Sequence, residues 1–440
     1  MNIVQIIPGS GGSFYCGNCL RDSKYVDALR KEGHQVVKIP MYLPLFSDEH
    51  DLNDIPVFYG AVSIYLKQLY PVFRRAPKWF DRLLNSKPLL KMAASMSGST
   101  NAKGLEDMTV SMLLGEEGKQ QEELERMVEW LATHCKPDVV HLSNALLLGL
   151  ARRLRERLQV PVVCSLQDED VWVDVMRPDF RDRVWELMSR KAEAVDAFIA
   201  VSHFYAGVMQ QRMNLPADKI FPVYLGVDPG EYEFGLSTEK PRNIGYISRL
   251  CPDNGLDIAV EAFILLKQQP GFEDVRMVIT GGSTGADADF IRELKKRIGE
   301  AGLTGLVDFY EAFEGAVRHD FFRSVAVATV PVRNGEAFGM YLPELMASGI
   351  PVVQPALGAF PEIVELSGGG LTYAPNSPEE LSKSLAAVLS DAALLARLSL
   401  QARKGVEERL NIHDHAREMI AVYHKLTGRN GNPPQPPADN

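Results

Sequence analysis

The sequence predicts an α/β protein built from two Rossmann-like, doubly wound domains. Short apolar runs typical of buried strands alternate with helical stretches along most of the 440 residues, and this alternation occurs in two series. A stretch that is rich in turn residues and lacks periodicity, 226–240, separates the two series. Regular alternation of this kind places parallel strands in a sheet that helices cover on both faces. We therefore expect an N-terminal domain over 1–225, a C-terminal domain over 241–410, a helix over 411–427 that returns toward the first domain, and a disordered tail over 428–440.

The N-terminal series begins with one βαβ unit and is then interrupted. A strand over Ile3–Ile7 leads through a helix over Cys19–Glu32 to a second strand over Gln35–Ile39. Residues from roughly 43 to 120 show no clean βα pattern and form an insertion. After it, the expected helices are Glu122–Cys135, Leu146–Arg157, Arg181–Ala194 and Phe204–Met213, and the expected strands are Asp138–Leu142, Val160–Leu166, Ala197–Val201 and Ile220–Tyr224.

The C-terminal series is regular from its first strand. The expected strands are Asn243–Ile247, Arg276–Thr280, Val307–Tyr310 and Val325–Val332, the expected helices are Leu256–Gln268, Ala288–Ala301 and Leu342–Ser348, and further units run through Val352–Gln354, Pro361–Glu365 and Pro378–Leu389. Pro343 is tolerated in the first turn of its helix, and Gly349 follows the helix end.

Charge and hydropathy narrow the class of protein. The formal net charge of -10 provides no global positive field, which argues against general nucleic-acid binding. No apolar run reaches the length of a membrane span, and the first residues lack the basic and apolar regions of a signal peptide. We therefore expect a cytoplasmic enzyme whose recognition of phosphate is local.

Neither the cysteines nor the first glycine-rich loop indicates a bound cofactor. Cys16 and Cys19 have metal-ligand spacing, but no spaced pair of further ligands accompanies them, so packing at a tight loop is the favoured interpretation. The loop Pro8–Gly12 precedes a helix, yet Phe14 stands where the dinucleotide fingerprint requires its last glycine. We expect no metal and no dinucleotide.

Two carboxylates mark the strongest candidate site. Glu336 and Glu344 are separated by seven residues and flank the junction between the predicted strand Val325–Val332 and the helix that follows. The N–H groups at such a junction favour phosphate, and an adjacent carboxylate accepts hydrogen bonds from sugar or ribose hydroxyls. The junction therefore suits a ligand with both kinds of group, such as a nucleotide-sugar.

This segment, with the following Gly349-Ile-Pro-Val-Val353, resembles the E-x7-E motif of family 4 retaining glycosyltransferases, which have the two-domain GT-B fold. The resemblance covers nearly the whole chain except roughly 43–120 and the tail. It implies two domains that face a central cleft. It also implies that Glu344 binds ribose hydroxyls, that Glu336 binds the donor sugar, and that the N–H groups of Phe338, Gly339 and Met340 bind phosphate or sugar.

The same resemblance assigns further donor-binding residues. The family has an Arg after the first strand of the second domain and a Lys five residues later; here Arg249 matches, but Asn254 stands in place of the Lys. The glycine-rich loops with Gly281 and Gly282, and with Gly11 and Gly12, match loops that approach the donor. The loop Tyr310–Phe313 matches the one that faces the base, which leaves uridine and guanosine open.

In the first domain the resemblance points to the ends of two strands. His141 ends the strand Asp138–Leu142, and Gln167-Asp168 stands where the family usually has His-Asp, on the acceptor and sugar side. An amide can bind a hydroxyl but cannot transfer a proton at pH 7. The acidic group Asp168, Asp170 and Asp174 has spacing suited to a metal clamp, but it lies in the wrong domain for one.

Together these features predict a metal-independent, retaining glycosyltransferase with Arg249, Glu336 and His141 as its catalytic residues. Its donor is a nucleoside-diphosphate-sugar, which is a substrate and not a cofactor, and its acceptor is a saccharide or a lipid-linked molecule in glycan, polysaccharide or glycolipid synthesis. Two alternatives stay open: a nucleotide-sugar epimerase of the same fold, and a catalytically weak sugar-nucleotide-binding relative, which the residues Asn254 and Gln167 suggest.

The insertion contains a stretch over 74–92 in which six basic side chains accompany apolar ones, with Asp81 as the single acidic residue. Such a stretch can lie on an anionic membrane surface at the inner face of the membrane. The alternative is a helix packed on its own domain with a solvated basic face. The first interpretation favours a lipid-linked acceptor.

Overall fold

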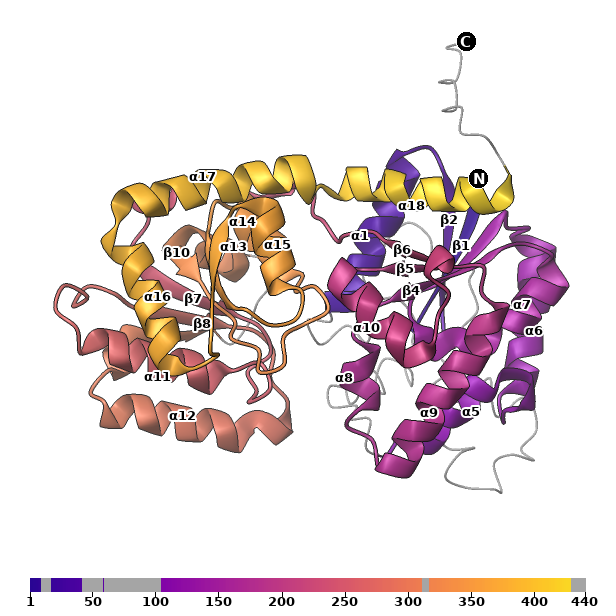
Figure 1. Ribbon diagram of the computed structural model, residues 1–440, viewed down its shortest axis with the longest axis horizontal. Coiled ribbons are helices and arrows are strands. Elements are labelled where there is room, and N and C mark those ends of the chain that lie inside the picture. The colour runs from indigo at the N-terminus through magenta and orange to yellow at the C-terminus, as the bar shows by residue number, and fades with distance from the viewer. Residues whose placement is uncertain (9–16, 42–57, 59–103, 311–315, 429–440) are drawn as a thin grey trace, which may run out of the picture. The chain divides into compact units, whose positions relative to one another are not determined.

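The computed structural model describes residues 1–8, 17–41, 58, 104–310 and 316–428, with the backbone alone for 17–20 and 316. The expectations for Gly11, Gly12, Cys16, Phe313, the stretch 74–92 and the tail 429–440 lie outside these residues. The chain divides into two compact units: unit 1 is Met1–Val201, Tyr205–Val223 and Ala416–Asn440, and unit 2 is Ser202–Phe204 and Tyr224–His415. Each unit holds one parallel six-stranded sheet with helices around it (Figure 1), which confirms the predicted fold class.

The sheet of unit 1 has the strand order β2-β1-β3-β4-β5-β6. Its strands are β1 (Asn2–Ile7), β2 (Gln35–Pro40), β3 (Val139–Leu142), β4 (Val162–Leu166), β5 (Ala197–Ala200) and β6 (Ile220–Pro222). Its helices are α1 (Gly17–Lys31), α5 (Glu106–Leu114), α6 (Gln121–His134), α7 (Ala151–Leu158), α8 (Glu169–Val173), α9 (Pro178–Lys191), α10 (His203–Met213) and α18 (Ile412–Thr427), of which α10 and α18 begin in unit 2. Strands β3 and β4 are buried along their whole length, as expected for the centre of a sheet covered on both faces.

The sheet of unit 2 has the order β12-β11-β10-β7-β8-β9, and all its strand pairs are parallel. Its strands are β7 (Asn243–Ile247), β8 (Met277–Thr280), β9 (Val307–Tyr310), β10 (Val325–Ala328), β11 (Val352–Pro355) and β12 (Gly370–Tyr373). Its helices are α11 (Leu256–Lys267), α12 (Ala288–Glu300), α13 (Ala316–Ser324), α14 (Tyr341–Ala347), α15 (Phe360–Ser367), α16 (Pro378–Ser390) and α17 (Ala392–Arg409).

The order of the unit 2 sheet determines which loops are neighbours. Strands β10, β7 and β8 are adjacent, and parallel strands have their carboxyl ends at the same edge of a sheet. The loops that follow these three strands, 329–340, 248–255 and 281–287, therefore leave from one edge. In open α/β sheets this is the edge where ligands bind.

Several elements differ from their sequence-based prediction for local reasons. The predicted strand Val325–Val332 ends at Ala328, because the N–H of Val330 donates to the side-chain oxygen of Gln354 instead of to a ladder partner. The predicted helix Leu146–Arg157 begins as a 3₁₀ segment over Ala145–Leu150, capped by Asn144, before α7 continues it. The predicted insertion, roughly 43–120, shows no clean βα pattern in the sequence, and its last part forms α5, most of whose residues are buried.

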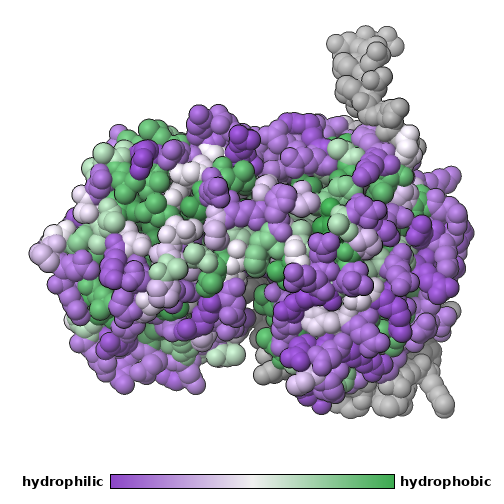
Figure 2. All heavy atoms as spheres, in the orientation of Figure 1, coloured by the Kyte–Doolittle hydropathy of each residue, from purple (hydrophilic) through white to green (hydrophobic). Residues whose placement is uncertain are grey.

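In the described part of the chain, no single helix combines the length and apolar character of a membrane span. Helices α16 and α17 meet that criterion only as a pair, and they bend by 97° where they join. Figure 2 shows apolar side chains gathered on the part of unit 2 where these two helices meet, and Leu400 of α17 is among the exposed large hydrophobic residues.

Candidate functional site

Glu344 lies in the first turn of α14 and is buried, with 1% of its surface exposed. Its Oε1 accepts a hydrogen bond from Arg318 Nη2 at 2.5 Å and another from the Tyr232 hydroxyl at 3.2 Å. The Arg318 guanidinium also lies 5.8 Å from the ring centroid of Tyr232. Burial, together with the charge of Glu344, raises the pKa of the Tyr232 hydroxyl above its usual range. The second carboxylate of the motif is therefore held in a defined position by a cation and a neutral phenol.

Glu336 lies in the loop between β10 and α14, where two close glycine turns fix the backbone. Gly335 and Gly358 both have positive φ, and a side chain on either would clash with the backbone of the other's turn. The Glu336 carbonyl accepts a hydrogen bond from Ala359 N at 3.0 Å. The predicted placement of Glu336 before the helix and Glu344 within its first turn is what the structure shows.

The three residues before α14 do not form a strong anion site by themselves. Phe338 is buried, Gly339 has a φ of 88°, and Met340 occupies the N-cap position without a side-chain capping hydrogen bond. A β-carbon at Gly339 would lie 3.1 Å from Glu336 Oε2, so this glycine gives the carboxylate room. However, α14 has seven residues, and so short a helix has few aligned peptide dipoles. Phosphate binding by these N–H groups stays a prediction.

Arg249 follows β7 and is anchored by the loop after β8. Its Nη2 donates to Asp287 Oδ1 and Oδ2, both at 3.1 Å, and its Nε lies 3.3 Å from Oδ2. Thr284 Oγ1 accepts from the same Nη2 at 3.3 Å. Burial alone would raise the pKa of Asp287, but hydrogen bonds from Thr284 and Arg249 outweigh it and lower the pKa below its usual value.

The glycines of the loop after β8 allow it to pack on the loop after β7. Gly281 has a φ of 140°, and a side chain there would clash with the Ser248 carbonyl. The carbonyl of Gly282 accepts a hydrogen bond from Leu250 N at 2.9 Å. The close approach at Gly281 therefore requires a glycine, whereas Gly282 contributes through its backbone carbonyl.

Asn254 is tied into the same loop. Its side-chain Nδ2 donates to Ser248 Oγ at 2.6 Å, and its backbone carbonyl accepts a hydrogen bond from the Tyr246 hydroxyl at 3.2 Å. The position that carries a Lys in the family is thus filled by a neutral side chain directed at its own loop. Arg249 is the cation that the sequence predicts here, and Asn254 adds no charge to it.

In unit 1, His141 lies in the interior of β3. Its Nδ1 is 2.6 Å from the Tyr423 hydroxyl of α18, and its Nε2 is 2.9 Å from Ser165 Oγ. Burial, with a smaller contribution from the charge of Arg21, lowers the pKa of His141 to about 3. A neutral ring with both nitrogens engaged favours a structural role over the catalytic one that the resemblance implies.

Gln167 and Asp168 follow β4 and are positioned by Glu169. Gln167 is buried, and its amide donates to the Ser143 carbonyl at 2.5 Å. Asp168 has a φ of 53°. Glu169 accepts hydrogen bonds from Gln167 N at 2.7 Å and from Ala145 N at 2.9 Å. Burial raises the pKa of the Glu169 carboxyl to about 7, against these hydrogen bonds, which lower it.

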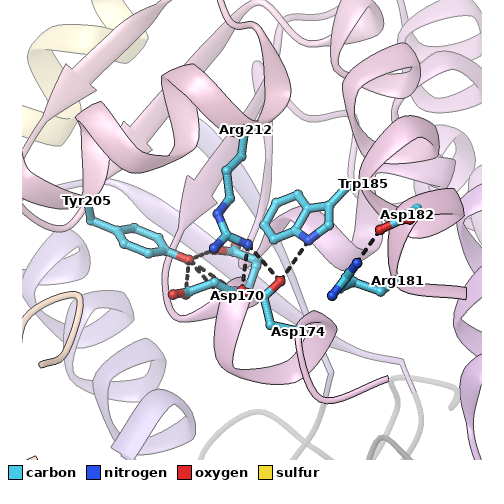
Figure 3. Close-up of polar contacts among 8 residues, drawn as sticks. Asp170, Asp174, Arg181, Asp182, Trp185, Tyr205 and Arg212 are labelled. Carbon is cyan, nitrogen blue, oxygen red and sulfur yellow. Dashed lines mark hydrogen bonds and ion pairs between the residues drawn. The ribbon is translucent and has the colours of Figure 1, made fainter. Parts of the chain in front are cut away.

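The acidic residues beyond Asp168 have separate partners, as Figure 3 shows. Asp170 lies 2.9 Å from the Tyr205 hydroxyl, whereas Asp174 is 2.6 Å from Arg212 and 3.0 Å from Trp185 Nε1. The Arg212 guanidinium stacks over the Trp185 ring at 4.8 Å. Among the described residues, no group of three or more His, Cys, Asp or Glu is arranged to hold a metal ion.

Sequence reasoning did not find three residues that hold the predicted ones: Arg318, Asp287 and Glu169. Arg318 and Asp287 lie 26 and 38 positions from their partners, and no fixed spacing relates them. Glu169 is the exception, since it directly follows Gln167-Asp168 at a strand end. An acidic residue directly after a predicted strand can be seen in the sequence, so Glu169 could have been noted as a candidate.

Comparison with known proteins identifies the family. Residues 231–405 match the family described as glycosyl transferases group 1, and residues 115–231 match Glycosyltransferase Family 4. An uncharacterised glycosyltransferase of Methanocaldococcus jannaschii is 24% identical over 69% of this chain and 78% of its own length. The lipopolysaccharide core biosynthesis mannosyltransferase of Rhizobium meliloti is 30% identical, over 50% of this chain and 59% of its own length, which is less than two thirds.

Solved structures share the fold at low identity. The Anabaena protein HepE in complex with UDP has a TM-score of 0.67 and 18% identity, and the comparison covers 97% of this chain and all of HepE. Sucrose-phosphate synthase from Thermosynechococcus elongatus has a TM-score of 0.69 and 17% identity, covering 97% and 99%. Two adjoining family models and full-length likeness to GT-B structures lead to one conclusion: the chain belongs to the family 4 glycosyltransferases.

Proposed function

We propose that this glycosyltransferase moves a sugar from a nucleoside-diphosphate-sugar to an acceptor hydroxyl, with retention of the anomeric configuration. The observation that carries the proposal is the arrangement at one edge of the unit 2 sheet. Glu336 and Glu344 flank the β10–α14 junction, and Arg249 leaves the adjacent strand β7. Carboxylates suited to hydroxyl groups and a cation suited to phosphate thus come from neighbouring strand ends.

Each residue has a distinct task in this proposal. Glu344, fixed by Arg318 and Tyr232, accepts hydrogen bonds from ribose hydroxyls. Glu336 contacts the donor sugar. Arg249 binds the diphosphate and stabilises the negative charge that grows on it as the sugar leaves. HepE has been solved in complex with UDP and with UDP-glucose, which supports a nucleotide-sugar donor here and leaves guanosine open as the base.

The proposal needs neither a metal nor an acid–base side chain in unit 1. Arg249 supplies a cation for the diphosphate, so we propose a metal-independent reaction. Gln167 cannot transfer a proton, and His141 is neutral and engaged at both nitrogens. In the resembling enzymes the departing phosphate itself accepts the acceptor's proton, and we propose the same here.

The acceptor is proposed to be a saccharide or a lipid-linked molecule in glycan, polysaccharide or glycolipid synthesis, reached from the cytoplasm. Peripheral contact of the stretch 74–92 with an anionic membrane belongs to this proposal. It predicts sedimentation of the full chain with vesicles containing phosphatidylserine at low salt, and release at high salt. Equal sedimentation with purely neutral vesicles, or none with either, would favour an acceptor in solution.

One observation favours a second candidate, a catalytically weak sugar-nucleotide-binding protein. Asn254 fills the position of the family's Lys without replacing its charge, so stabilisation of the leaving group depends more heavily on Arg249. The product distinguishes both candidates from a nucleotide-sugar epimerase, because an epimerase would release an epimer of the donor sugar.

One experiment tests these readings together. The chain is incubated with UDP-glucose, UDP-N-acetylglucosamine and GDP-mannose without acceptor, and the products are followed by proton NMR before mutarotation. We expect slow hydrolysis of one donor, with the α-sugar released first. Binding without any turnover would favour the weak relative, release of an epimer would favour the epimerase, and the absence of binding to every donor would overturn the proposal.

A further inference from the structure

Arg249 is held along one edge of its guanidinium by a buried carboxylate that neither the motif nor the resemblance includes. We infer that Asp287 is a positioning residue, which orients Arg249 toward the diphosphate of the donor. The inference rests on the proposed function and deepens it, because it names the group on which recognition of the diphosphate depends. Asp287 itself has no part in contacting the ligand.

The hydrogen bonds of the Arg249 guanidinium support this orientation. Arg249 carries five N–H groups in a fixed planar fork. Its hydrogen bonds to Asp287 and Thr284 involve Nε and Nη2. In the described part of the chain Nη1 makes no hydrogen bond, and 45% of the Arg249 side chain is exposed. One edge is thus fixed to the protein, and the two N–H groups of Nη1 remain for a phosphate.

Asp287 is itself immobilised, which a positioning residue requires. Its side chain is 6% exposed. It closes the 3₁₀ segment Gly285–Asp287 in a capping box, in which its Oδ2 accepts from Thr284 N at 2.8 Å and from Thr284 Oγ1 at 2.7 Å. The loop that carries it is pinned to the Arg249 loop by the hydrogen bond between Leu250 N and the Gly282 carbonyl. Arg249 is therefore oriented by a rigid support and not by a mobile surface partner.

The negative charge of Asp287 also opposes phosphate binding. Removal of Asp287 therefore has two opposite effects on affinity: less repulsion of the phosphate and less order in Arg249. The carboxylate partly neutralises Arg249, but it is separated from the ligand by the guanidinium, and the exposed side of the site is screened by water. Without the carboxylate, a half-exposed arginine regains its rotamer freedom and has to lose it again on binding. Orientation therefore outweighs charge, and removal of Asp287 weakens binding.

The test is Asp287→Asn in the full chain, with UDP, UMP and uridine, and with GDP, GMP and guanosine, as probes in isothermal titration calorimetry. Asparagine keeps the shape and a capping oxygen but loses the charge that holds Arg249. We expect about tenfold weaker binding of the nucleoside diphosphate, as is common when a supporting partner is removed, and no change for the nucleoside. In an Arg249→Met background, Asp287→Asn should change diphosphate affinity less than twofold.

A matched control is Asp308→Asn, which breaks the 2.9 Å pair of Asp308 in β9 with Arg276, the residue before β8, and should leave every affinity unchanged. Thr284→Val serves as a second variant if Asp287→Asn does not fold, because it removes one hydrogen bond to each partner and leaves the carboxylate. We expect a smaller loss from it, again confined to the phosphorylated probes.

The outcomes separate this inference from the proposed function. If the wild-type chain binds neither UDP nor GDP, the proposed function fails and the inference fails with it. If the wild type binds and Asp287→Asn binds equally or more tightly, the inference alone is overturned. An equal loss of affinity for the nucleoside would also overturn it, since the defect would then be a general one of the fold.

Discussion

The polar side chains near the strand ends of the two sheets differ in exposure and in hydrogen bonding. In unit 2, the Arg249 side chain is 45% exposed and keeps Nη1 without a hydrogen bond to any described residue. In unit 1, His141 and Gln167 are at most 4% exposed and bond to Ser165, Tyr423 and Ser143. We propose that Arg249 at the carboxyl edge of the unit 2 sheet is available to a ligand, whereas His141 and Gln167 bond to residues of their own unit.

The contrast concerns Arg249 and not Glu344, because Glu344 is as buried as His141, with 1% of its surface exposed. A hydrogen bond in a low-dielectric interior strengthens its neighbours, so a satisfied buried network fixes the loops it joins. Glu169 does this in unit 1, where it accepts hydrogen bonds from N–H groups of the loops after β3 and β4 and lies 2.9 Å from the Tyr205 hydroxyl of α10. We propose that substitutions in unit 2 have the largest effects on activity, and the following predictions test this difference between the two units.

The largest effect is expected for Arg249→Ala. Loss of a preorganised donor to a charge that develops in the transition state lowers kcat by about 100- to 1000-fold. Arg276→Ala is the control, because Arg276 is a similarly exposed arginine of unit 2 whose partner is Asp308. The measurement is donor hydrolysis or transfer at saturating donor. A loss of less than tenfold would remove Arg249 from the proposed reaction.

Glu344→Gln is expected to weaken nucleoside diphosphate binding by about 10- to 100-fold, because hydrogen bonds to a charged acceptor contribute about 1.5–3 kcal/mol. Inorganic pyrophosphate, which has no ribose, should bind to the variant and the wild type equally. Glu365→Gln, at an exposed position of α15, provides the control. Equal losses for both ligands would show that Glu344 acts on the fold and not on the ribose.

Arg318→Met is expected to lower the free energy of unfolding by about 2 kcal/mol, because it removes the guanidinium that pairs with the buried carboxylate of Glu344. The partial exposure of Arg318, 23%, keeps the figure below that of a fully buried pair. Arg323→Met is a matched control on the same helix, since Arg323 and its partner Glu233 are both mostly exposed and such pairs contribute little. Similar urea midpoints for the two variants would contradict the prediction.

The smallest effect on activity is expected for His141→Asn. The pKa of His141 is lowered to about 3 by burial, so the ring stays neutral from pH 5 to 9 and cannot shape the pH profile of kcat/KM there. We expect profiles that agree within about twofold, because no titration is lost. His134→Asn, at an exposed position of α6, is the control. A pH limb that disappears in His141→Asn would restore the catalytic role that the family resemblance implies.

The same pKa predicts how stability depends on pH. In the unfolded chain His141 has its ordinary pKa near 6.5, so the unfolded state binds a proton that the folded state does not as pH falls from 6.5 to about 3. The folded state is therefore destabilised over this window, and above pH 6.5 the effect is absent. Urea unfolding of His141→Asn and the wild type should give free energies that differ by an amount that depends on pH below 6.5 and is constant above it.

Local sequence patterns predicted the alternating strands and helices of the two units well. The bounds of β7 and β9 agree with the sequence-based prediction, since each is a short apolar run between turn residues. The position of Glu336 and Glu344 around a strand–helix junction followed from the same patterns. The predicted ends of helices and strands were less accurate. Strand β10 ends before the predicted residue because the side chain of Gln354 accepts the hydrogen bond of Val330 N in place of a neighbouring strand.

The partners of the site residues could not be predicted, for a physical reason. Arg318 reaches Glu344, and Asp287 reaches Arg249, only because the order of strands brings separate loops and helices together. No local period encodes such a contact. The burial of His141 was likewise hidden, because it depends on Tyr423 of α18, which lies 282 positions away.

The most direct test of the account is amide hydrogen exchange of the full chain with and without a saturating nucleoside diphosphate, UDP or GDP. Slower exchange on binding marks the backbone that the ligand stabilises. We predict that protection is concentrated in the unit 2 segments 248–255, 281–287 and 335–344, and that the unit 1 segments 143–147 and 166–171 change much less. Protection confined to the unit 1 segments, or no protection with either nucleotide, would contradict the claim that the carboxyl edge of the unit 2 sheet holds the donor.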